Sequence, residues 1–513
     1  MTDDALFLPI GIDACQLAPE SAGAGPLLCL VEVRASSAES RVVDLYLLRP
    51  DGRALVTCQG LRLRPASRER LQAAMVPLGL SNLLALEWVE EPLTAATGAT
   101  ACDWILIEGE RRTGRLVADA LQDSGAAVAC VAATDRLASV NDFGAALAEA
   151  TRARTPGHTL RVVVMFDPAD ASPLQLESAC RRLITIAQSL AGARLAGSVR
   201  LIVATGPAES ATTDALDQGT KVSTALGLVR VLRMEYPQWS CAFVHLGSSV
   251  GASHMAVALA AASEGAEVAT AYRGDRRHVL RLLPLKRATP RAPLRIPQGK
   301  TVLITGGNRG LGLHAAAWLV EQGAKHLALM SRGGERPEHR LQLASWRARG
   351  VSVTTLAVDV CDAQAVAGAI RTIDASGAPL GGIIHSAGVV HDGLLAKMSL
   401  EDFHRVADPK IRGAWNLCQA TREHELDFIV FYSSISSLLG PPGQAGYAAA
   451  NGYLDGLAHE LALAGIPAMS INWGPWSEIG MAGRLDPVDR DRMRAAGLKF
   501  ISPQEGDRLL AIC

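Results

Sequence analysis

Short apolar runs alternate with alanine-rich stretches over most of the 513-residue chain. Runs of this length are typical of buried strands, and strands that alternate with helices form parallel sheets covered by helices. The pattern therefore predicts an α/β domain over residues 83–290. Its expected strands lie at residues 83–89, 104–108, 128–131, 160–166 and 199–204.

The first 65 residues differ, because no helical pattern separates their apolar runs. The runs at residues 27–34, 42–48 and 54–58 are interpreted as strands, and Pro50-Asp51-Gly52 is typical of a hairpin turn. We expect a small antiparallel sheet here, too small to bury a full core by itself. Residues 66–82 are interpreted as a linker with a charged, helical start.

A second series of strands follows a Pro- and Arg-rich stretch at residues 285–298, which we interpret as a linker. No convincing glycine-rich phosphate turn follows any strand of the first series, which favours a structural role for that half. The expected fold class is α/β, with two Rossmann-like, doubly wound, parallel-sheet subdomains. The first, at 83–290, is truncated and structural, and the second, at 296–513, is catalytic. The strands of the second are expected at residues 301–305, 326–330, 351–360, 382–388 and 427–432.

Composition narrows the classes of function. The chain has 50 basic and 51 acidic residues, so its net charge of −1 offers no field that attracts nucleic acid or a membrane surface. No apolar run reaches the length of a membrane span, and the acidic N-terminus is not a signal peptide. The 10 cysteines are scattered, with no zinc-type spacing. We therefore expect no metal site and reduced thiols in a cytoplasmic protein.

The chemistry of the second α/β domain begins at a glycine-rich turn directly after its first strand. The spacing is G-x-x-x-G-x-G, and a helical run follows, so backbone N–H groups and a helix N-terminus can approach a pyrophosphate. Strand, loop and helix in this order make the signal specific. The residues assigned to the turn are Thr305, Gly306, Gly307, Asn308, Gly310, Leu311 and Gly312.

Three later strand ends complete the predicted nucleotide site. The second strand ends at Ser331-Arg332, where an acidic residue favours NAD and an arginine accommodates the phosphate of NADP. Arg332 therefore indicates NADPH. Asp359-Val360, at the third strand end, is expected beside the adenine. Ala387-Gly388, at the fourth, is expected under the ribose and nicotinamide.

The fifth strand ends in serines, and Ser434 is the candidate among them. A Gly/Pro loop then leads into an alanine-rich helix in which Tyr447 and Asn451 are one turn apart and share a face. A hydroxyl at a strand end and a tyrosine on the next helix can converge on one spot. The residues alone leave an alternative open, in which the strand end is merely rich in hydroxyls and the tyrosine is a core residue whose hydroxyl has a hydrogen-bond partner.

Together these segments resemble the short-chain dehydrogenase/reductase superfamily. The glycine turn, the Ala387-Gly388 strand end, the serine–tyrosine pair and the segment 472–476 (Asn-Trp-Gly-Pro-Trp) carry the resemblance. That superfamily usually has a lysine four residues after the tyrosine, where this chain has Asn451. Lys410, on the helix before the serine strand, is the lysine instead. This arrangement, in which the lysine and the asparagine have exchanged places, resembles that of the ketoreductase domains of modular polyketide synthases.

The resemblance implies a reaction. Ketoreductases of this kind reduce a β-ketoacyl thioester, held on the phosphopantetheine of an acyl carrier protein, to the β-hydroxyacyl thioester with NADPH. It implies Tyr447 as the proton donor and Ser434 as a donor to the substrate carbonyl oxygen. It also implies that Lys410 lowers the pKa of the tyrosine, and that Asn451 holds Lys410 and a relay water.

The resemblance extends to the rest of the chain. Residues 227–237 are similar to the structural subdomain of these ketoreductases. Residues 1–65 more loosely resemble the end of a double-hotdog dehydratase domain, without the catalytic histidine motif of that domain. The chain thus looks like a fragment of a megasynthase. Its expected partners are other polyketide synthase domains and a carrier protein, since no carrier motif occurs in this sequence.

Further family positions concern the substrate. Members with Leu-Asp-Asp give the D-hydroxy product, and Val390-His391-Asp392 keeps the last aspartate. The tryptophan of the opposite class would fall at Leu439, so we expect the D outcome. The family also implies a lid after Gly474-Pro475. A redox-silent or epimerising scaffold domain is the alternative function. The positions assigned to substrate and stereocontrol are Asp392, Leu439, Gln444, Pro475 and Met481.

Overall fold

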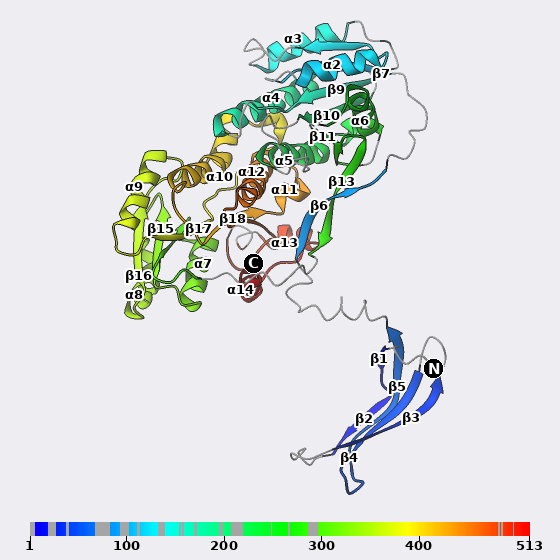
Figure 1. Cartoon of the computed structure of the whole chain (residues 1–513), viewed down its shortest axis with the longest axis vertical. Helices are drawn as coiled ribbons and strands as arrows, with labels where there is room; N and C mark the ends of the chain where they lie inside the picture. The colour runs from blue at the N-terminus through cyan, green and yellow to red at the C-terminus, as the bar shows by residue number, and fades with distance from the viewer. Residues whose placement is uncertain are drawn as a thin grey trace. The chain divides into compact units, whose positions relative to one another are not determined.

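A computed structural model of the chain divides into two compact units, Met1–Leu83 and Leu84–Cys513 (Figure 1). Each unit is described by itself. The linkers expected at 66–82 and 285–298 lie almost wholly outside the described residues. The structure describes residues 6–18, 27–36, 41–66, 83–92, 102–109, 113–131, 139–152, 155, 158–168, 172–193, 198–206, 219–247, 249–264, 267–285, 296–480, 483, 486–495 and 497–512.

The first unit is an antiparallel sheet in the order β1-β5-β4-β3, with β2 also paired to β5. The expected hairpin turn is present: Gly52 has a φ of +85°, and its N–H donates to Arg49 O at 2.9 Å. The sequence did not predict β1 and β2, because Pro9 and Gly11 interrupt the apolar pattern. The strands are β1 (Leu6–Gly11), β2 (Ala14–Leu17), β3 (Leu28–Ser36), β4 (Arg41–Leu48) and β5 (Ala54–Ala66).

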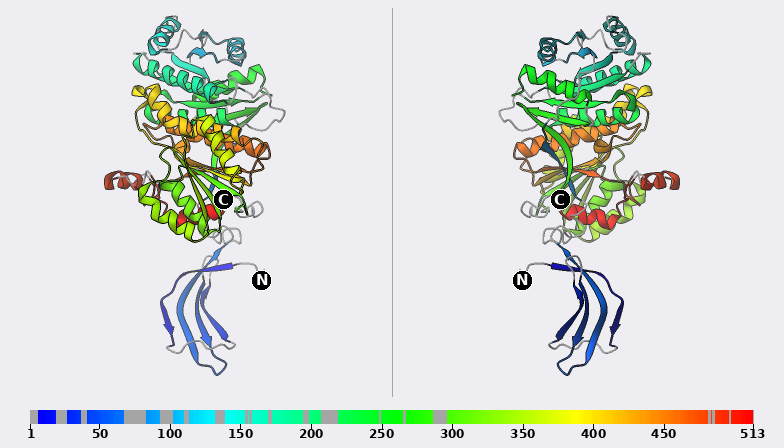
Figure 2. Two further views of the ribbon diagram at one scale, coloured as in Figure 1. Left: turned by 90° about the vertical axis from the view of Figure 1, so that its left-hand side faces the viewer. Right: turned by 90° about the vertical axis from the view of Figure 1, so that its right-hand side faces the viewer.

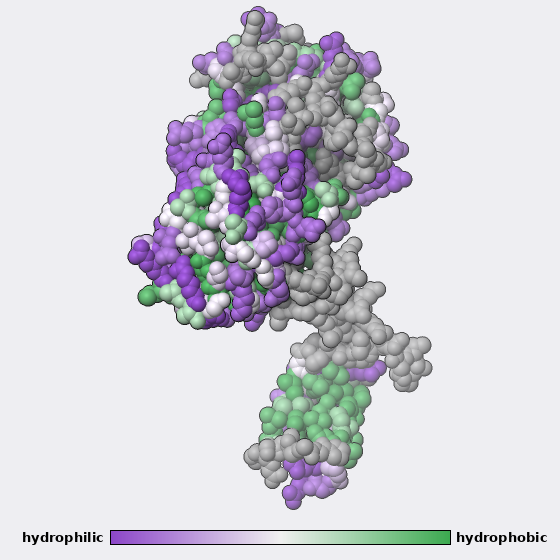
Figure 3. Space-filling view, turned by 60° about the vertical axis from the view of Figure 1, so that its left-hand side comes forward, coloured by the Kyte–Doolittle hydropathy of each residue, from purple (hydrophilic) through white to green (hydrophobic). Residues whose placement is uncertain are grey.

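This small sheet leaves apolar side chains uncovered. Successive side chains of a strand point to opposite faces. On β3, Leu28 and Leu30 are 58% and 55% exposed on one face, and Val31 and Val33 are 49% and 57% exposed on the other. Figure 3 shows this hydrophobic surface on the unit. The described part of the unit therefore has no core of its own around β3, as its size predicted.

The second unit begins with an eight-stranded sheet in the order β6-β13-β12-β11-β10-β9-β7-β8. Its centre is parallel, as the alternating pattern predicted. The parallel assignment was wrong for residues 83–89, because β6 pairs antiparallel with β13, which folds back from β12 in a hairpin. The strands are β6 (Leu84–Glu90), β7 (Cys102–Ile107), β8 (Val128–Val131), β9 (Thr159–Met165), β10 (Val199–Thr205), β11 (Ala242–Leu246), β12 (Ala269–Arg273) and β13 (Arg276–Pro284).

Side chains pack closely against the glycines that follow two strands of this first sheet. A Cβ added at Gly109, after β7, would lie 3.1 Å from Asp167 Cβ, and one at Gly206, after β10, would lie 2.6 Å from Thr113 Cγ2. Glycine at these two positions lets neighbouring side chains approach the backbone closely. The helices around the sheet are α2 (Thr113–Asp123), α3 (Val140–Ala150), α4 (Pro173–Gly192), α5 (Thr220–Glu235) and α6 (Ala252–Glu264), with η2 at Pro237–Trp239.

The remaining sheet has six parallel strands in the order β16-β15-β14-β17-β18-β19, the doubly wound order, and the α/β fold class is confirmed. Its strands are β14 (Thr301–Thr305), β15 (His326–Ser331), β16 (Ser352–Ala357), β17 (Leu380–His385), β18 (Phe428–Ser434) and β19 (Ala468–Trp473). Its helices are α7 (Gly310–Glu321), α8 (Arg340–Ala348), α9 (Ala363–Asp374), α10 (Leu400–Ala420), α11 (Ser436–Leu439), α12 (Ala445–Leu463), α13 (Pro487–Ala495) and α14 (Pro503–Ile512), with η3 at Pro337–His339 and η4 at Leu395–Lys397. In the part of the chain that is described, no helix combines the length and the apolar character needed to cross a bilayer.

Helices α5 and α12 lie together in the layer between the two sheets (Figures 1 and 2). Their backbones approach closely because α12 has small residues at the contact. A Cβ at Gly452 would overlap Ser223 O, and one at Gly456 would lie 2.5 Å from Gly219 C. On the α5 side, a Cβ at Gly227 would lie 2.5 Å from Ala448 O. The subdomains are therefore joined backbone to backbone along two helices.

We expect the Gly452→Ala substitution to lower the free energy of unfolding by about 2 kcal/mol, because the new methyl group forces α5 and α12 apart. Thermal and denaturant unfolding would measure the loss. The matched control is Gly368→Ala on α9, where an added Cβ meets only a flexible Arg371 tip at 3.7 Å. That change should be neutral or stabilising by up to about 1 kcal/mol. Equal stability of Gly452→Ala and the parent would contradict the close contact.

Candidate active site

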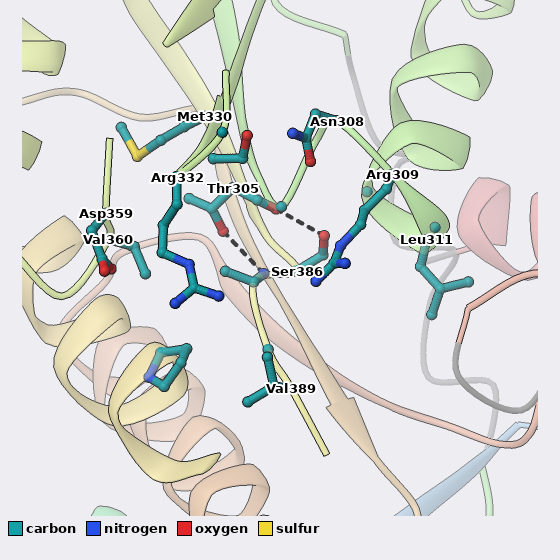
Figure 4. Close-up of a pocket in the computed structure, with 18 of the residues that line it drawn as sticks. Thr305, Asn308, Arg309, Leu311, Met330, Arg332, Asp359, Val360, Ser386 and Val389 are labelled. Carbon is teal, nitrogen blue, oxygen red and sulfur yellow. Dashed lines mark hydrogen bonds between the residues drawn. The ribbon is translucent and has the colours of Figure 1, made fainter. Parts of the chain in front are cut away.

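A cavity of about 540 Å³ lies at the carboxyl ends of β14, β15, β16 and β17, where the strand order reverses (Figure 4). This is the place where doubly wound sheets bind nucleotides. Gly307 is the one predicted cofactor residue outside the lining; a Cβ there would lie 2.8 Å from Ile304 O, beneath the turn. The predicted residues in the lining are Thr305, Gly306, Asn308, Gly310, Leu311, Gly312, Ser331, Arg332, Asp359, Val360, Ala387 and Gly388.

The turn between β14 and α7 requires glycine for two reasons. Gly306 has a φ of +67°, and Gly310 has a φ of +53°, both in the left-handed region. A Cβ at Gly312 would lie 2.5 Å from Ser386 Oγ. The turn therefore keeps its backbone open to the cavity and ends in the first turn of α7. Free N–H groups at a helix N-terminus suit an anionic group such as a pyrophosphate.

Hydrogen bonds tie the ends of β14 and β17 together behind the cavity (Figure 4). Thr305 Oγ1 accepts from Ala387 N at 3.2 Å. It also pairs with His385 Nδ1 at 2.7 Å. Ser386 Oγ donates to Thr305 O at 2.8 Å. Burial, and then the charge of Lys410, lower the pKa of His385 to about 3, so its imidazole is neutral. The wall on which a ribose and nicotinamide are expected is thus rigid.

Two arginines reach into the cavity from opposite sides, Arg332 after β15 and Arg309 in the glycine turn (Figure 4). Among the described residues, neither guanidinium forms an ion pair with a carboxylate, so both remain available for an anion. Arg336 also lines the cavity, but it is held by Glu338 at 2.6 Å. Sequence analysis missed Arg309 and Arg336. A basic residue inside the turn itself was the signal that could have found Arg309.

Ser434 and Tyr447 come together beside this cavity. Ser434 is the last residue of β18, and its Oγ accepts from Ser436 N at 3.1 Å. Tyr447 is buried in the first turn of α12. Burial raises the pKa of the Tyr447 phenol, and hydrogen bonds with the Ser434 and Asn451 side chains oppose that rise. The phenol is therefore protonated at neutral pH and able to act as an acid.

Lys410 lies close to both Tyr447 and the cavity wall, although it comes from a different helix. Its Nζ donates to Tyr432 O at 2.8 Å and lies 5.7 Å from the centre of the Tyr447 ring. A Cβ at Gly388, in the cavity wall, would lie 3.0 Å from Lys410 Cε. Burial lowers the pKa of Lys410 to about 8, and the charge of Asp455 opposes the shift.

Among the described residues, Asn451 forms a hydrogen bond with the tyrosine but none with the lysine. Its Nδ2 donates to Tyr447 O at 2.8 Å and lies 3.5 Å from Ser436 Oγ. Over the described residues, no hydrogen bond joins Asn451 to Lys410, and Asn451 Oδ1 is a buried acceptor without a partner. The structure thus brings Ser434, Tyr447, Asn451 and Lys410 to one place, with Lys410 held by the backbone of β18 rather than by Asn451.

Comparisons with known proteins identify the family. Residues 300–478 match the KR domain family, and residues 1–73 match the polyketide synthase dehydratase N-terminal domain. The chain is 33% identical over 465 residues to a phenolphthiocerol/phthiocerol polyketide synthase protein of Mycobacterium tuberculosis, covering 86% of this chain and 25% of the relative. The chain belongs to the ketoreductases of polyketide synthases. A second relative of this ketoreductase, polyketide synthase GfsB of Streptomyces halstedii, is 41% identical over 212 residues, 41% of this chain and 4% of that protein.

Solved structures resemble the ketoreductase over most of its length. An A-type ketoreductase from a modular polyketide synthase is 29% identical, with a TM-score of 0.72, and the match covers 85% of this chain and 91% of that one. The first ketoreductase of the tylosin synthase is 25% identical, with a TM-score of 0.69, and the match covers 85% and 90%. By contrast, the chain spans a quarter or less of the length of the curated synthases above.

Four of the five predicted substrate positions of the ketoreductase lie among the described residues. Gln444 Nε2 donates to Asp392 Oδ1 at 3.1 Å, and burial raises the pKa of Asp392 while this bond opposes the rise. Leu439 is 51% exposed at the end of α11. Pro475 O accepts from Ile501 N at 2.8 Å. Met481 lies outside the described residues; Gly480, just before it, lines the cavity.

The lowered pKa of Lys410 makes a prediction about stability and pH. The unfolded lysine titrates near 10.5 and the folded one near 8, so the unfolded chain binds the extra proton between these values. Stability of the parent should therefore rise as the pH rises through this window. Below pH 8 we expect Lys410→Met to be more stable than the parent by roughly 3 kcal/mol, a gain that vanishes above pH 10.5.

Denaturant unfolding at pH 7 and pH 10.5 would measure this difference. Lys397→Met, at an exposed position on η4, is the control and should show no such dependence on pH. A Lys410→Met difference that stays constant between the two pH values would show that the buried ammonium does not have the lowered pKa.

Proposed function

We propose that this ketoreductase reduces the β-keto group of an acyl thioester to the D-hydroxy group, with NADPH, in cytoplasmic polyketide biosynthesis. The proposed substrate is carried on the phosphopantetheine arm of an acyl carrier protein, beside other domains of the same synthase. One observation carries the proposal: Ser434, Tyr447 and Lys410 meet next to a nucleotide-sized cavity. Lys410 connects the tyrosine with the cavity, since it packs against Gly388 in the cavity wall and lies 5.7 Å from the Tyr447 ring centre.

The residues of the cavity fit a nicotinamide dinucleotide. The glycine turn and the N-terminus of α7 would hold the pyrophosphate, and a Cβ at Gly312 would fill space close to Ser386. Arg332 and Arg309 support the choice of NADPH, because two guanidinium groups without carboxylate partners among the described residues suit the additional phosphate. When bound, the cofactor supplies the hydride.

Residues of the chain would donate a hydrogen bond and a proton to the oxygen of the ketone. Ser434 Oγ accepts from Ser436 N, and its hydroxyl would donate to the carbonyl oxygen of a bound substrate. Tyr447 would give that oxygen its proton, since its pKa is raised and the phenol is protonated. Lys410, still charged at pH 7, would stabilise the tyrosinate that remains. Asn451 Oδ1, a buried acceptor, supports its role in the proton relay.

The D outcome rests on Asp392 and Leu439. Asp392 is kept and bonded to Gln444, and Leu439 stands where the tryptophan of the opposite class would fall. A redox-silent or epimerising domain would keep the same loops without consuming NADPH. The assay below separates these functions, because only a reductase oxidises NADPH when a β-ketoacyl thioester is added.

The tyrosine assignment is tested by Tyr447→Phe. With a β-ketoacyl-N-acetylcysteamine thioester, we expect NADPH oxidation to fall by about 10²- to 10⁴-fold, because the proton donor is lost, while NADPH still binds. Tyr453→Phe is the matched control: Tyr453 is buried on the same helix, and its hydroxyl has no partner among the described residues. A Tyr447→Phe enzyme as fast as Tyr453→Phe would refute the assignment.

The choice of cofactor is tested by Arg332→Ala. Removing one of the two phosphate-facing guanidinium groups should weaken NADPH binding by roughly tenfold, and leave NADH binding unchanged. Fluorescence titration with each nucleotide would measure both dissociation constants. Arg349→Ala, which removes an exposed arginine paired with Glu321, is the control. An unchanged preference for NADPH in Arg332→Ala would show that Arg332 does not select the cofactor.

A further inference from the structure

Glu235, the last residue of α5, links the structural subdomain to two loops on the substrate side of the catalytic subdomain. We propose that Glu235 is a positioning residue: its carboxylate sets the spacing between the loop at 389–394 and the loop at 440–444. This spacing determines how a ketone is presented to Tyr447. The inference rests on the proposed function and deepens it, because it assigns the structural subdomain a part in orienting the substrate.

The two oxygens of Glu235 bind two different loops. Oε2 accepts from Leu395 N at 2.8 Å, and Oε1 accepts from Gly443 N at 2.8 Å. Leu395 begins η4, so its N–H has no partner within that helix. Hydrogen bonds from N–H groups to a carboxylate are about twice as strong as those between neutral groups. One side chain therefore fixes two backbone positions at once.

The position of this carboxylate has no local explanation. Negative charge at a helix C-terminus is unfavourable, because the macrodipole already places negative charge there. The end of α5 does not depend on it: Tyr236 N donates to Leu232 O, and the Tyr236 ring stacks on Trp239 with centroids 4.0 Å apart. The bonds to the two loops offset the unfavourable placement, and the rigid helix end makes Glu235 a fixed anchor.

The two loops lead directly to the reacting groups. They are joined to each other by Gly393 N, which donates to Gly443 O at 2.9 Å, and by the Gln444–Asp392 bond. Gln444 immediately precedes α12, the helix of Tyr447. The loop at 389–394 continues from Gly388, and its first residues line the cofactor cavity. Glu235 thus sets the start of the tyrosine helix against the edge of the cavity wall.

Two other side chains of the structural subdomain hold neighbouring segments. Gln188 Nε2, on α4, donates to Leu395 O at 2.9 Å and Met398 O at 3.0 Å. Arg230 Nη1, on α5, donates to Ser437 O in α11 at 2.6 Å. The residues that line the cofactor cavity, by contrast, all fall between Thr305 and Gly480. Glu235 itself binds Leu395 and Gly443, neither of which lines the cavity, so we expect its effect to fall on the substrate rather than on the cofactor.

The test compares two identical chemical changes. Glu235→Gln keeps the shape but turns one acceptor into an NH₂ group that faces a backbone N–H. Glu267→Gln makes the same change in the structural subdomain, where Glu267 pairs with Arg281 at 2.7 Å. For Glu235→Gln we expect kcat/KM for a β-ketoacyl-N-acetylcysteamine thioester to fall roughly 10- to 100-fold. The share of the minor alcohol on a chiral column should rise, and the Kd for NADPH should stay unchanged. Glu267→Gln should match the parent in all three.

Hydrogen exchange followed by mass spectrometry tests, without any reaction, whether Glu235 holds the two loops. Peptides over 389–398 and 440–447 should exchange faster in Glu235→Gln than in the parent, and the peptide over 301–312 should not. If the parent reduces no thioester, the proposed function fails, but hydrogen exchange still shows whether Glu235 holds the two loops. If Glu235→Gln cannot be folded, Glu235→Asp, which keeps the charge but shortens its reach, replaces it. Parent-like exchange together with a parent-like product ratio, in either variant, would overturn the proposal.

Discussion

The contact between α5 and α12 is the constraint on which the rest of the ketoreductase depends. Three glycines, Gly227, Gly452 and Gly456, let the two helix backbones touch. The helix that carries Tyr447 is therefore packed against the first α/β subdomain. This subdomain provides a surface for the tyrosine helix, and a side chain at any of the three glycines would push the two helices apart.

Buried charge is the second constraint. Lys410 is almost fully enclosed, and the Asp455 carboxylate supports its charge. Asp455 is itself held by Ser470 Oγ at 2.6 Å, Ser437 Oγ at 2.8 Å and Asn472 Nδ2 at 2.8 Å, although burial still raises its pKa. Asn472 Nδ2 also lies 3.3 Å from Ser434 O. One polar network thus connects the buried Lys410 charge with the position of Ser434.

Local patterns in the sequence were enough for the central parallel strands and the glycine turn, because each depends on spacing within one strand or turn. The candidate tetrad lies on two helices and one strand, and its lysine was assigned from a family resemblance. Contacts between segments that are distant in the sequence could not be predicted from local patterns. The antiparallel pairing of β6 with β13 depends on a hairpin from β12, and Asn451 binds Tyr447 O where a bond to Lys410 was expected. Glu235 lay inside a segment recognised only as structural, since nothing local shows that its carboxylate meets Leu395 and Gly443.

The central claim is that hydride passes from NADPH to the β-carbon of a thioester held at Ser434 and Tyr447. The most direct measurement uses NADPH deuterated at C4 of the nicotinamide, on the transferred face, with a β-ketoacyl-N-acetylcysteamine thioester. Mass spectrometry of the product should find one deuterium on the carbinol carbon, and a chiral column should find mainly the D alcohol. Recovery of the unchanged ketone from an enzyme that still binds NADPH would contradict the account.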